Sequence, residues 1–167
     1  MIVNLYFLSD VSYGGWVSVL VNVYNLIKKN GSVPYIYKIS NKTEKFYRNI
    51  GYGAKYRNIK KEHISASVNT ADVNLIVAVE KNQRALLKYF PMDCYLIIHD
   101  PTELDYDNIN ILTKFEIITL RTGIHYFLES KGILNTMVPM PYDYKYYDTI
   151  STTNKSSAIS ISRVDWD

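Results

Sequence analysis

Short apolar runs alternate along the chain with segments in which apolar residues recur every three or four positions. The run from residue 2 to residue 8 shows no strict alternation, which predicts a parallel strand that is covered on both faces. From Trp16 to Ile27 the apolar residues fall on one helical face, and the helix is expected to end at Lys28-Lys29-Asn30 with Gly31 as its cap. Residues 34–39 predict a second strand, so the first forty residues predict a βαβ unit.

The same alternation continues over most of the chain. Further strands are predicted at about 56–59, 74–79, 95–98, 116–120 and 137–140, and helices at about 82–89 and 122–131. Alternation of this kind predicts an α/β fold, a Rossmann-like doubly wound parallel sheet with right-handed crossovers.

The composition changes near the carboxyl end. Residues 142–154 are polar and aromatic, residues 151–157 have the composition of a linker, and residues 158–162 predict a new strand. We therefore expect a Rossmann-like domain over 1–150, a linker over 151–157 and the start of a second, truncated domain over 158–167. The alternative is that residues 158–162 form a last edge strand of the first sheet.

Length and composition limit the class of protein. The chain has 167 residues, 47% of them hydrophobic, which is enough for the core of one domain. The single cysteine, Cys94, is expected to be buried and inert; it excludes an internal disulfide framework and favours a reducing compartment. No membrane-spanning or export segment is apparent, so a cytoplasmic protein is expected. Abundant Tyr, Ile, Asn and Lys, which have AT-rich codons, are typical of phage, other viral or low-GC bacterial genes.

The segment from Ser9 to Gly15 carries the strongest chemical signal. It follows the first predicted strand and precedes the first predicted helix, where open α/β sheets bind ligands. The pair Gly14-Gly15 would let backbone N–H groups approach an anion at the helix amino terminus. The alternative is a tight turn that needs glycine for a positive φ. Dinucleotide-binding G-x-G-x-x-G and P-loop motifs are absent.

Other polar residues follow the predicted strands. His99-Asp100 ends one strand, where a histidine could bind a hydroxyl group; the alternative is a polar strand end before the Pro101 turn. Arg121 and Arg163 each follow a predicted strand and could meet an anion, or face water. His63 and His125 are isolated, with His125 expected on the exposed face of its helix, and no pair has metal-ligand spacing, so no metal site is predicted.

Five segments carry a resemblance when they are taken in order. They are the Gly14-Gly15 turn with its helix, the strand end at His99-Asp100, the strand–turn–helix of 117–133, the stretch 137–143, and the terminal 160–167, which is similar to a V-G-R-[LF] motif. Together they resemble the amino-terminal half of a GT-B glycosyltransferase, nearest the large retaining family that includes glycogen and lipopolysaccharide transferases. The chain departs from the pattern of that family at three places. It has Leu120-Arg121 where the family has a serine turn, Met140-Pro141-Tyr142 where the family has P-N-G, and Ser162 where the family has a glycine.

The resemblance implies a function. It implies transfer of a sugar from a nucleotide-sugar donor, with retention, to an acceptor that is a glycan, lipid, protein or DNA; the donor is a substrate, and no cofactor is implied. Gly14, Gly15 and Arg163 would meet the donor diphosphate, Arg121 an anion, and His99 the transferred sugar or the acceptor. This chain would carry mainly the acceptor-side half, and a carboxyl-terminal domain would be missing. The alternative is a non-catalytic α/β binding or interaction module.

Overall fold

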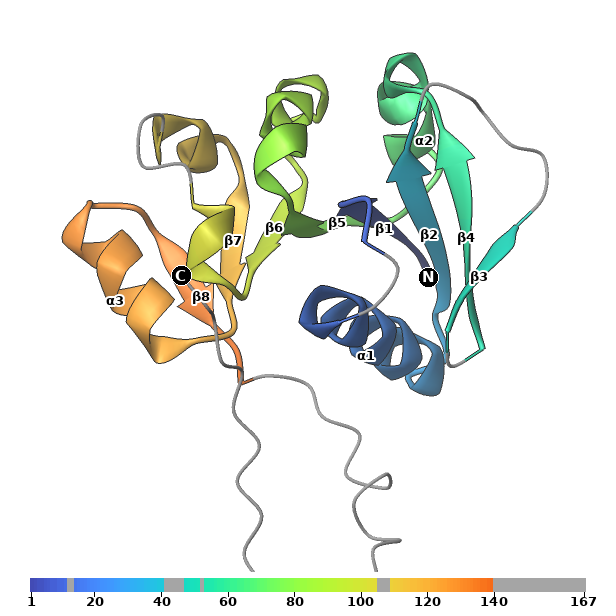
Figure 1. The fold of residues 1–167 in the computed structure, drawn as a ribbon, viewed down its shortest axis with the longest axis horizontal. Helices are drawn as coiled ribbons and strands as arrows, with labels where there is room; N and C mark the ends of the chain where they lie inside the picture. The colour runs from blue at the N-terminus through green and yellow to red at the C-terminus, as the bar shows by residue number, and fades with distance from the viewer. Residues whose placement is uncertain (12–13, 41–46, 52, 105–108, 140–167) are drawn as a thin grey trace, which may run out of the picture.

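Eight strands form one sheet in the computed structural model, in the order β3-β4-β2-β1-β5-β6-β7-β8 (Figure 1). The structure describes residues 1–11, 14–40, 47–51, 53–104 and 109–139. The strands are β1 Ile2–Leu8, β2 Val33–Ile39, β3 Arg48–Gly51, β4 Ala54–Ile59, β5 Val73–Val79, β6 Tyr95–Ile98, β7 Glu116–Thr119 and β8 Asn135–Met137. Every neighbouring pair is parallel except β3 with β4, so the predicted α/β class with a mostly parallel sheet is confirmed.

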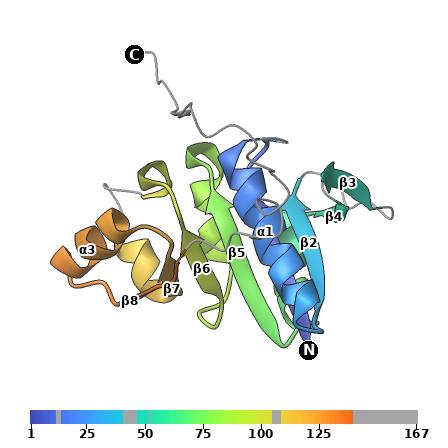
Figure 2. The ribbon, with the colours of Figure 1, turned by 90° about the horizontal axis from the view of Figure 1, so that it is seen from below.

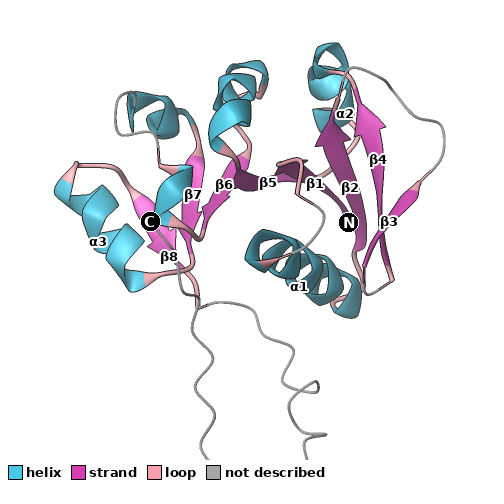
Figure 3. Cartoon of the chain, viewed as in Figure 1, coloured by secondary structure: helices cyan, strands magenta, loops and turns pink. Residues whose placement is uncertain are grey.

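Helices lie on both faces of this sheet. The helix α1, Gly15–Lys29, covers one face over β1, β2 and β5. Figure 2 shows this helix from below, between β5 and β2. The opposite face carries α2, Ile64–Val68, and the 3₁₀ segments η1, Lys61–His63, and η2, Lys81–Tyr89 (Figure 3). Two more 3₁₀ segments, η3 Pro101–Glu103 and η4 Ile109–Lys114, precede β7, and α3, Thr122–Ser130, precedes β8.

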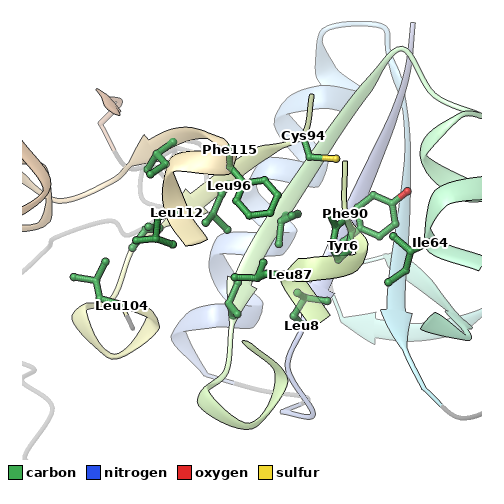
Figure 4. Packing of buried hydrophobic residues seen from close by; sticks show 14 of the residues in the cluster. Tyr6, Leu8, Ile64, Leu87, Phe90, Cys94, Leu96, Leu104, Leu112 and Phe115 are labelled. Carbon is green, nitrogen blue, oxygen red and sulfur yellow. The ribbon is translucent and has the colours of Figure 1, made fainter. Parts of the chain in front are cut away.

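Each face of the sheet has its own hydrophobic cluster. The larger cluster lies on the α2 side and joins residues from the strands, η2, η4 and α3; ten of them are labelled in Figure 4: Tyr6, Leu8, Ile64, Leu87, Phe90, Cys94, Leu96, Leu104, Leu112 and Phe115. The second cluster packs Val17, Leu20 and Val21 of α1 against Leu5 and Phe7 of β1. Because β1 is buried on both faces, its sequence is a continuous apolar run with little alternation.

A buried polar network joins the short helix α2 to β1. The side-chain amide of Asn4 donates to the carbonyl of Ser67 at 2.7 Å, and the hydroxyl groups of Tyr6 and Ser67 are 2.9 Å apart. Asn74 of β5 donates to the carbonyl of Val68 at 3.2 Å. Five residues of helix have little stability of their own, so these hydrogen bonds and the buried Ile64 and Val68 hold α2 in place.

Three local differences from the sequence-based expectation have physical causes. Residues 81–89 form a 3₁₀ helix rather than an α-helix, and Phe90 after it is extended, as a residue before Pro91 prefers. The antiparallel strand β3 was not expected, because Arg48–Gly51 has one buried apolar residue, Ile50, and depends on its pairing with β4. The last predicted strand, 137–140, is wrong in position, since β8 ends at Met137.

The strand β5 contains one more residue than β1 needs for regular pairing. Tyr6 pairs with Ile76, but Leu8 pairs with Val79, so the register shifts between them. Ala78 has a φ of +66°, and Val77 and Ala78 both pack in the cluster on the α1 side. This is a β-bulge with its extra residue at Ala78.

Within the described part of the chain, no helix combines the length and the apolar character needed to cross a bilayer. The expected linker over 151–157 and the expected second domain over 158–167, together with the alternative edge strand, lie outside the described residues.

Candidate functional site

The carboxyl ends of β1, β2, β5 and β6 share one edge of the sheet, and the turn into α1 lies there (Figure 2). Gly14 precedes the helix with a φ of +94°, which favours glycine, whereas Gly15, the first helical residue, does not have a positive φ. Among the described residues, no atom lies within 4 Å of a Cβ atom placed on either glycine. No described side chain caps α1, and its first turn contains no acidic residue. The backbone at this helix start is therefore open to an anion.

The first half of the turn is held by Glu80, which follows β5. Its Oε2 atom accepts hydrogen bonds from the Ser9 hydroxyl and from the backbone N–H of Asp10, both at 3.0 Å. The side-chain amide of Gln83 donates to Asp10 at 2.9 Å. Ser9 is fully buried. Its burial and these hydrogen bonds hold Ser9 and Asp10 in place at the end of β1.

A lysine at the end of β2 reaches the same turn. The ammonium group of Lys38 donates to the carbonyl of Val11 at 3.3 Å and lies 5.4 Å from the ring centroids of both Phe7 and Tyr56. Burial lowers the pKa of Lys38, and the nearby charges of Asp10 and Glu80 oppose this effect. Lys38 thus places a partly desolvated positive charge beside the turn, where it would attract an anion more strongly than an exposed lysine would.

His99 lies at the end of β6 and is only 3% exposed. Its Nδ1 atom is 2.7 Å from Oε1 of Glu103, and its backbone N–H donates to Oε2 of the same carboxylate at 3.0 Å. The Nδ1–Oε1 contact is short but not aligned as a hydrogen bond, and neither atom has another partner among the described residues. The ring of Trp16, the second residue of α1, meets the imidazole edge to face at 6.2 Å between centroids. The first turn of α1 therefore lies beside His99 through the ring of Trp16.

Asp100 has a structural role in the turn that follows β6. Its carboxylate accepts hydrogen bonds from the backbone N–H of Thr102 at 2.9 Å and from its hydroxyl at 2.7 Å. Burial raises the pKa of Asp100, but these hydrogen bonds outweigh it and the net pKa is lowered. The guanidinium of Arg84 donates to the carbonyl of Thr102, which ties η2 to this turn.

Of the two arginines that were predicted to meet an anion, the structure describes only Arg121. Arg121 is exposed and lies just before α3, and its positive charge acts on Asp100. It is thus near the carboxyl end of β6, but the described structure gives it no contact with Gly14, Gly15 or His99. Arg163 lies outside the described residues.

The remaining histidines and the cysteine lie apart from this edge. The expectation that His125 is exposed is wrong, because its Nδ1 atom contacts the side-chain oxygen of Asn135 at 2.7 Å and only 20% of its side chain is exposed. Cys94 is buried, as expected, and burial raises the pKa of its thiol to about 12. No group of three metal-ligating side chains occurs among the residues that the structure describes.

Sequence reasoning missed two residues at this edge. Glu103 follows His99 by four positions, and that spacing joins them only because Pro101 starts a 3₁₀ turn that folds the carboxylate back. Lys38 is a charged residue inside an otherwise apolar and aromatic strand, and this was the available signal for a special role.

Neither a family model, nor a curated protein, nor a solved structure matches this chain. The resemblance to retaining GT-B glycosyltransferases therefore rests on the sequence motifs.

Proposed function

We propose that this chain is the acceptor-side half of a retaining glycosyltransferase that uses a nucleotide-sugar donor. The observation that carries the proposal is the presence of glycine at position 15, where the fold does not require it. Neither a positive φ nor a nearby atom requires glycine at this position, and alanine would stabilise the start of a helix. A ligand that approaches the backbone closely would require it, and the open helix start favours an anionic ligand.

The donor diphosphate fits this position chemically. In sugar transfer the bond from the sugar to the diphosphate breaks, and negative charge grows on the departing diphosphate. The N–H groups of Gly15 and its neighbours, with the ammonium of Lys38 beside the turn, would stabilise that charge. His99, which meets Trp16 next to Gly15, would hydrogen-bond a hydroxyl of the sugar or of the acceptor.

A second domain completes the proposed enzyme. Arg163 would add positive charge from across the cleft, and Arg121 would meet a further anionic group at the same edge. The acceptor belongs to one of four classes: glycan, lipid, protein or DNA. A chain with one wall of the cleft would bind the donor weakly and turn it over poorly, because catalysis needs groups from both sides in fixed positions.

The test measures binding of nucleoside diphosphates and nucleotide sugars to the 167-residue chain by NMR chemical-shift perturbation. We expect amide shifts at Gly14, Gly15 and Trp16, and loss of those shifts in Gly15→Val. The matched control is Gly123→Val, because Gly123 lies at the start of α3, also lacks a positive φ and also has no atom within 4 Å of a Cβ. Unchanged binding by a folded Gly15→Val chain would reject the diphosphate site.

The burial of His99 favours a second candidate function, a non-catalytic binding module. An imidazole that is 3% exposed and in contact with a carboxylate could serve only the structure. One measurement, sugar transfer from the donor, distinguishes the two functions. A chain that includes the sequence beyond Asp167 should transfer sugar from the donor if it is the enzyme, and should bind ligand without transfer if it is the module.

A further inference from the structure

The carboxylate of Glu103 faces two nitrogen atoms of one residue. Its Oε2 atom accepts from the backbone N–H of His99 at 3.0 Å, and its Oε1 atom lies 2.7 Å from Nδ1 of the same residue. Both side chains are almost completely buried, at 4% and 1% exposure. Water therefore cannot replace either partner, and the two groups must satisfy each other.

This geometry restricts where the imidazole proton can lie. An ionised carboxylate only accepts hydrogen bonds, so a neutral His99 must carry its proton on Nδ1 to satisfy Oε1. Nε2 then holds a lone pair. Among the described residues no hydrogen bond to Nε2 is found, whereas Nδ1 lies 2.7 Å from Oε1 of Glu103 and has no other described partner. Free histidine prefers the opposite tautomer, with the proton on Nε2.

We propose that Glu103 is a positioning residue that fixes the proton of His99 on Nδ1 and thereby presents Nε2 as a hydrogen-bond acceptor for a hydroxyl group. A sugar or polyol hydroxyl is the chemical class that such an acceptor binds. The identity of that ligand rests on the proposed function, whereas the state of the imidazole does not.

The charges and the burial around Glu103 act in opposite directions. Burial raises the pKa of Glu103, and the contacts with His99 offset this effect only in part. Three other charged groups lie near the end of β6: Asp100, whose carboxylate accepts from Thr102, Arg121, whose charge acts on Asp100, and Arg84, which donates to Thr102. Lys38, Asp10 and Glu80 lie further along the same edge, around the start of the turn. Asp100 interacts with His99 only through its charge, and none of these groups has a described hydrogen bond or ring contact with the imidazole. Glu103 is thus the group in contact with Nδ1.

Glu103→Gln gives a sharp test because it should reverse the position of the proton while the amide oxygen and the amide nitrogen each still face a partner. An amide offers one acceptor and one donor in place of two acceptors. The backbone N–H of His99 cannot change, so it takes the amide oxygen. The amide NH₂ then faces Nδ1, which must lose its proton, and the neutral imidazole carries its proton on Nε2 instead.

The measurement is ¹⁵N NMR of the three histidine rings in the full 167-residue chain at a pH where imidazoles are neutral. His99 is assigned by comparison with His63→Gln and His125→Gln variants. We expect the Nδ1–H form in the wild type and the Nε2–H form in Glu103→Gln. An Nε2–H or doubly protonated ring in the wild type, or the same tautomer in both proteins, would overturn the proposal. The wild-type spectrum alone shows whether His99 carries its proton on Nδ1, even if the variant does not fold.

The chain contains a matched control on α3. His125 and Glu129 have the same spacing of four residues, but their nitrogen and oxygen atoms are 3.6 Å apart and Glu129 is 55% exposed. Glu129→Gln should leave the tautomer of every histidine unchanged. An equal change at His125 in this control would mean that any nearby carboxylate has the effect, and would remove the special role of Glu103.

A second measurement separates this proposal from the proposed function. In a chain extended beyond Asp167, Glu103→Gln should lower kcat for sugar transfer roughly 100-fold or more, within the range that one positioned proton-transfer group supplies. KM for the donor should change little. Absence of transfer in the wild-type chain would reject the glycosyltransferase and leave the tautomer result intact. Normal transfer by a Glu103→Gln protein with a reversed tautomer would reject the role of Glu103.

Discussion

The indole of Trp16 closes one side of the imidazole of His99, edge to face, with 6.2 Å between the ring centroids. The contact joins the first turn of α1 to the end of β6, and the two residues that make it are more than eighty positions apart in the chain. Trp16 therefore shields the pair of His99 and Glu103 from the side of the glycine turn. A ligand on that turn would lie against the indole.

Removal of the indole should open this pair to water. In Trp16→Ala we expect the backbone amide of His99, which donates to Glu103, to exchange its hydrogen roughly tenfold faster, a change of about 1.4 kcal/mol in local opening free energy. Trp16→Phe should keep most of the protection, because a ring edge remains. Hydrogen exchange followed by NMR gives the rates, with the amide of Leu96 in the same strand as reference. Equal rates in wild type and Trp16→Ala would show that other groups shield the pair.

The two glycines of the turn should respond differently to alanine. Gly14→Ala places a side chain at a φ of +94° and should lower the free energy of unfolding by about 1–3 kcal/mol. Gly15→Ala should leave it unchanged or raise it by up to about 1 kcal/mol, since alanine favours helix and its Cβ meets no atom. Urea denaturation of the two variants measures both values. A large loss of stability in Gly15→Ala would show that this glycine serves the fold, and the support for the diphosphate site would disappear.

Lys38 should affect ligand binding more than stability. Lys38→Met keeps a long unbranched side chain beside Phe7 and Tyr56 but removes the charge beside the turn. We expect the affinity for a nucleoside diphosphate to fall about tenfold, while Lys29→Met, at the exposed end of α1, leaves it unchanged. Titration calorimetry in low salt compares the three proteins. Equal affinities would place the bound phosphate elsewhere.

Alkaline conditions should destabilise the core before they affect the surface. Burial raises the pKa of Cys94 from 9.0 to about 12, and burial likewise raises the pKa of Tyr6 from 10.0 to about 12. Both groups stay neutral in the folded protein, so their stabilising effect is complete below pH 9 and is lost as the pH rises from 9 to 12. Each contributes a slope of at most about 1.4 kcal/mol per pH unit.

The variants Cys94→Ala and Tyr6→Phe should each flatten this dependence. Urea denaturation at pH values from 8 to about 11 gives the slopes, and the double variant should show the smallest loss of stability. Both variants will be less stable than the wild type near pH 8, because one leaves a small cavity and the other removes the hydroxyl that contacts Ser67. Parallel curves for all four proteins would contradict burial as the cause.

The α/β class and several strands of the sheet could be predicted from the sequence, because burial on two faces leaves a continuous apolar run. The continuous apolar runs gave β1 and β6 with their observed bounds, and the helical periodicity gave α1 to within one residue. The strand β3 and the helix α2 gave little local signal, since four or five residues of mixed polarity acquire their structure from their neighbours. The placement of His99 and the start of α1 at the same edge of the sheet is what the rule that parallel strands end at one edge leads us to expect. The contact with Glu103 could not be predicted, because it depends on the conformation of one 3₁₀ turn.

The bulge in β5 has a consequence for how this chain should be aligned with others. Leu8 pairs with Val79 only because Ala78 is inserted between two regular stretches, so removal of Ala78 would leave the pairing of Tyr6 with Ile76 and of Leu8 with Val79 intact. Glu80 would still lie opposite Ser9 and Asp10. A deletion at this point is thus the one change of length in β5 that the sheet absorbs without loss of register. A homologue that is one residue shorter here should carry its gap at Ala78, and its counterpart of Glu80 should still hold the turn.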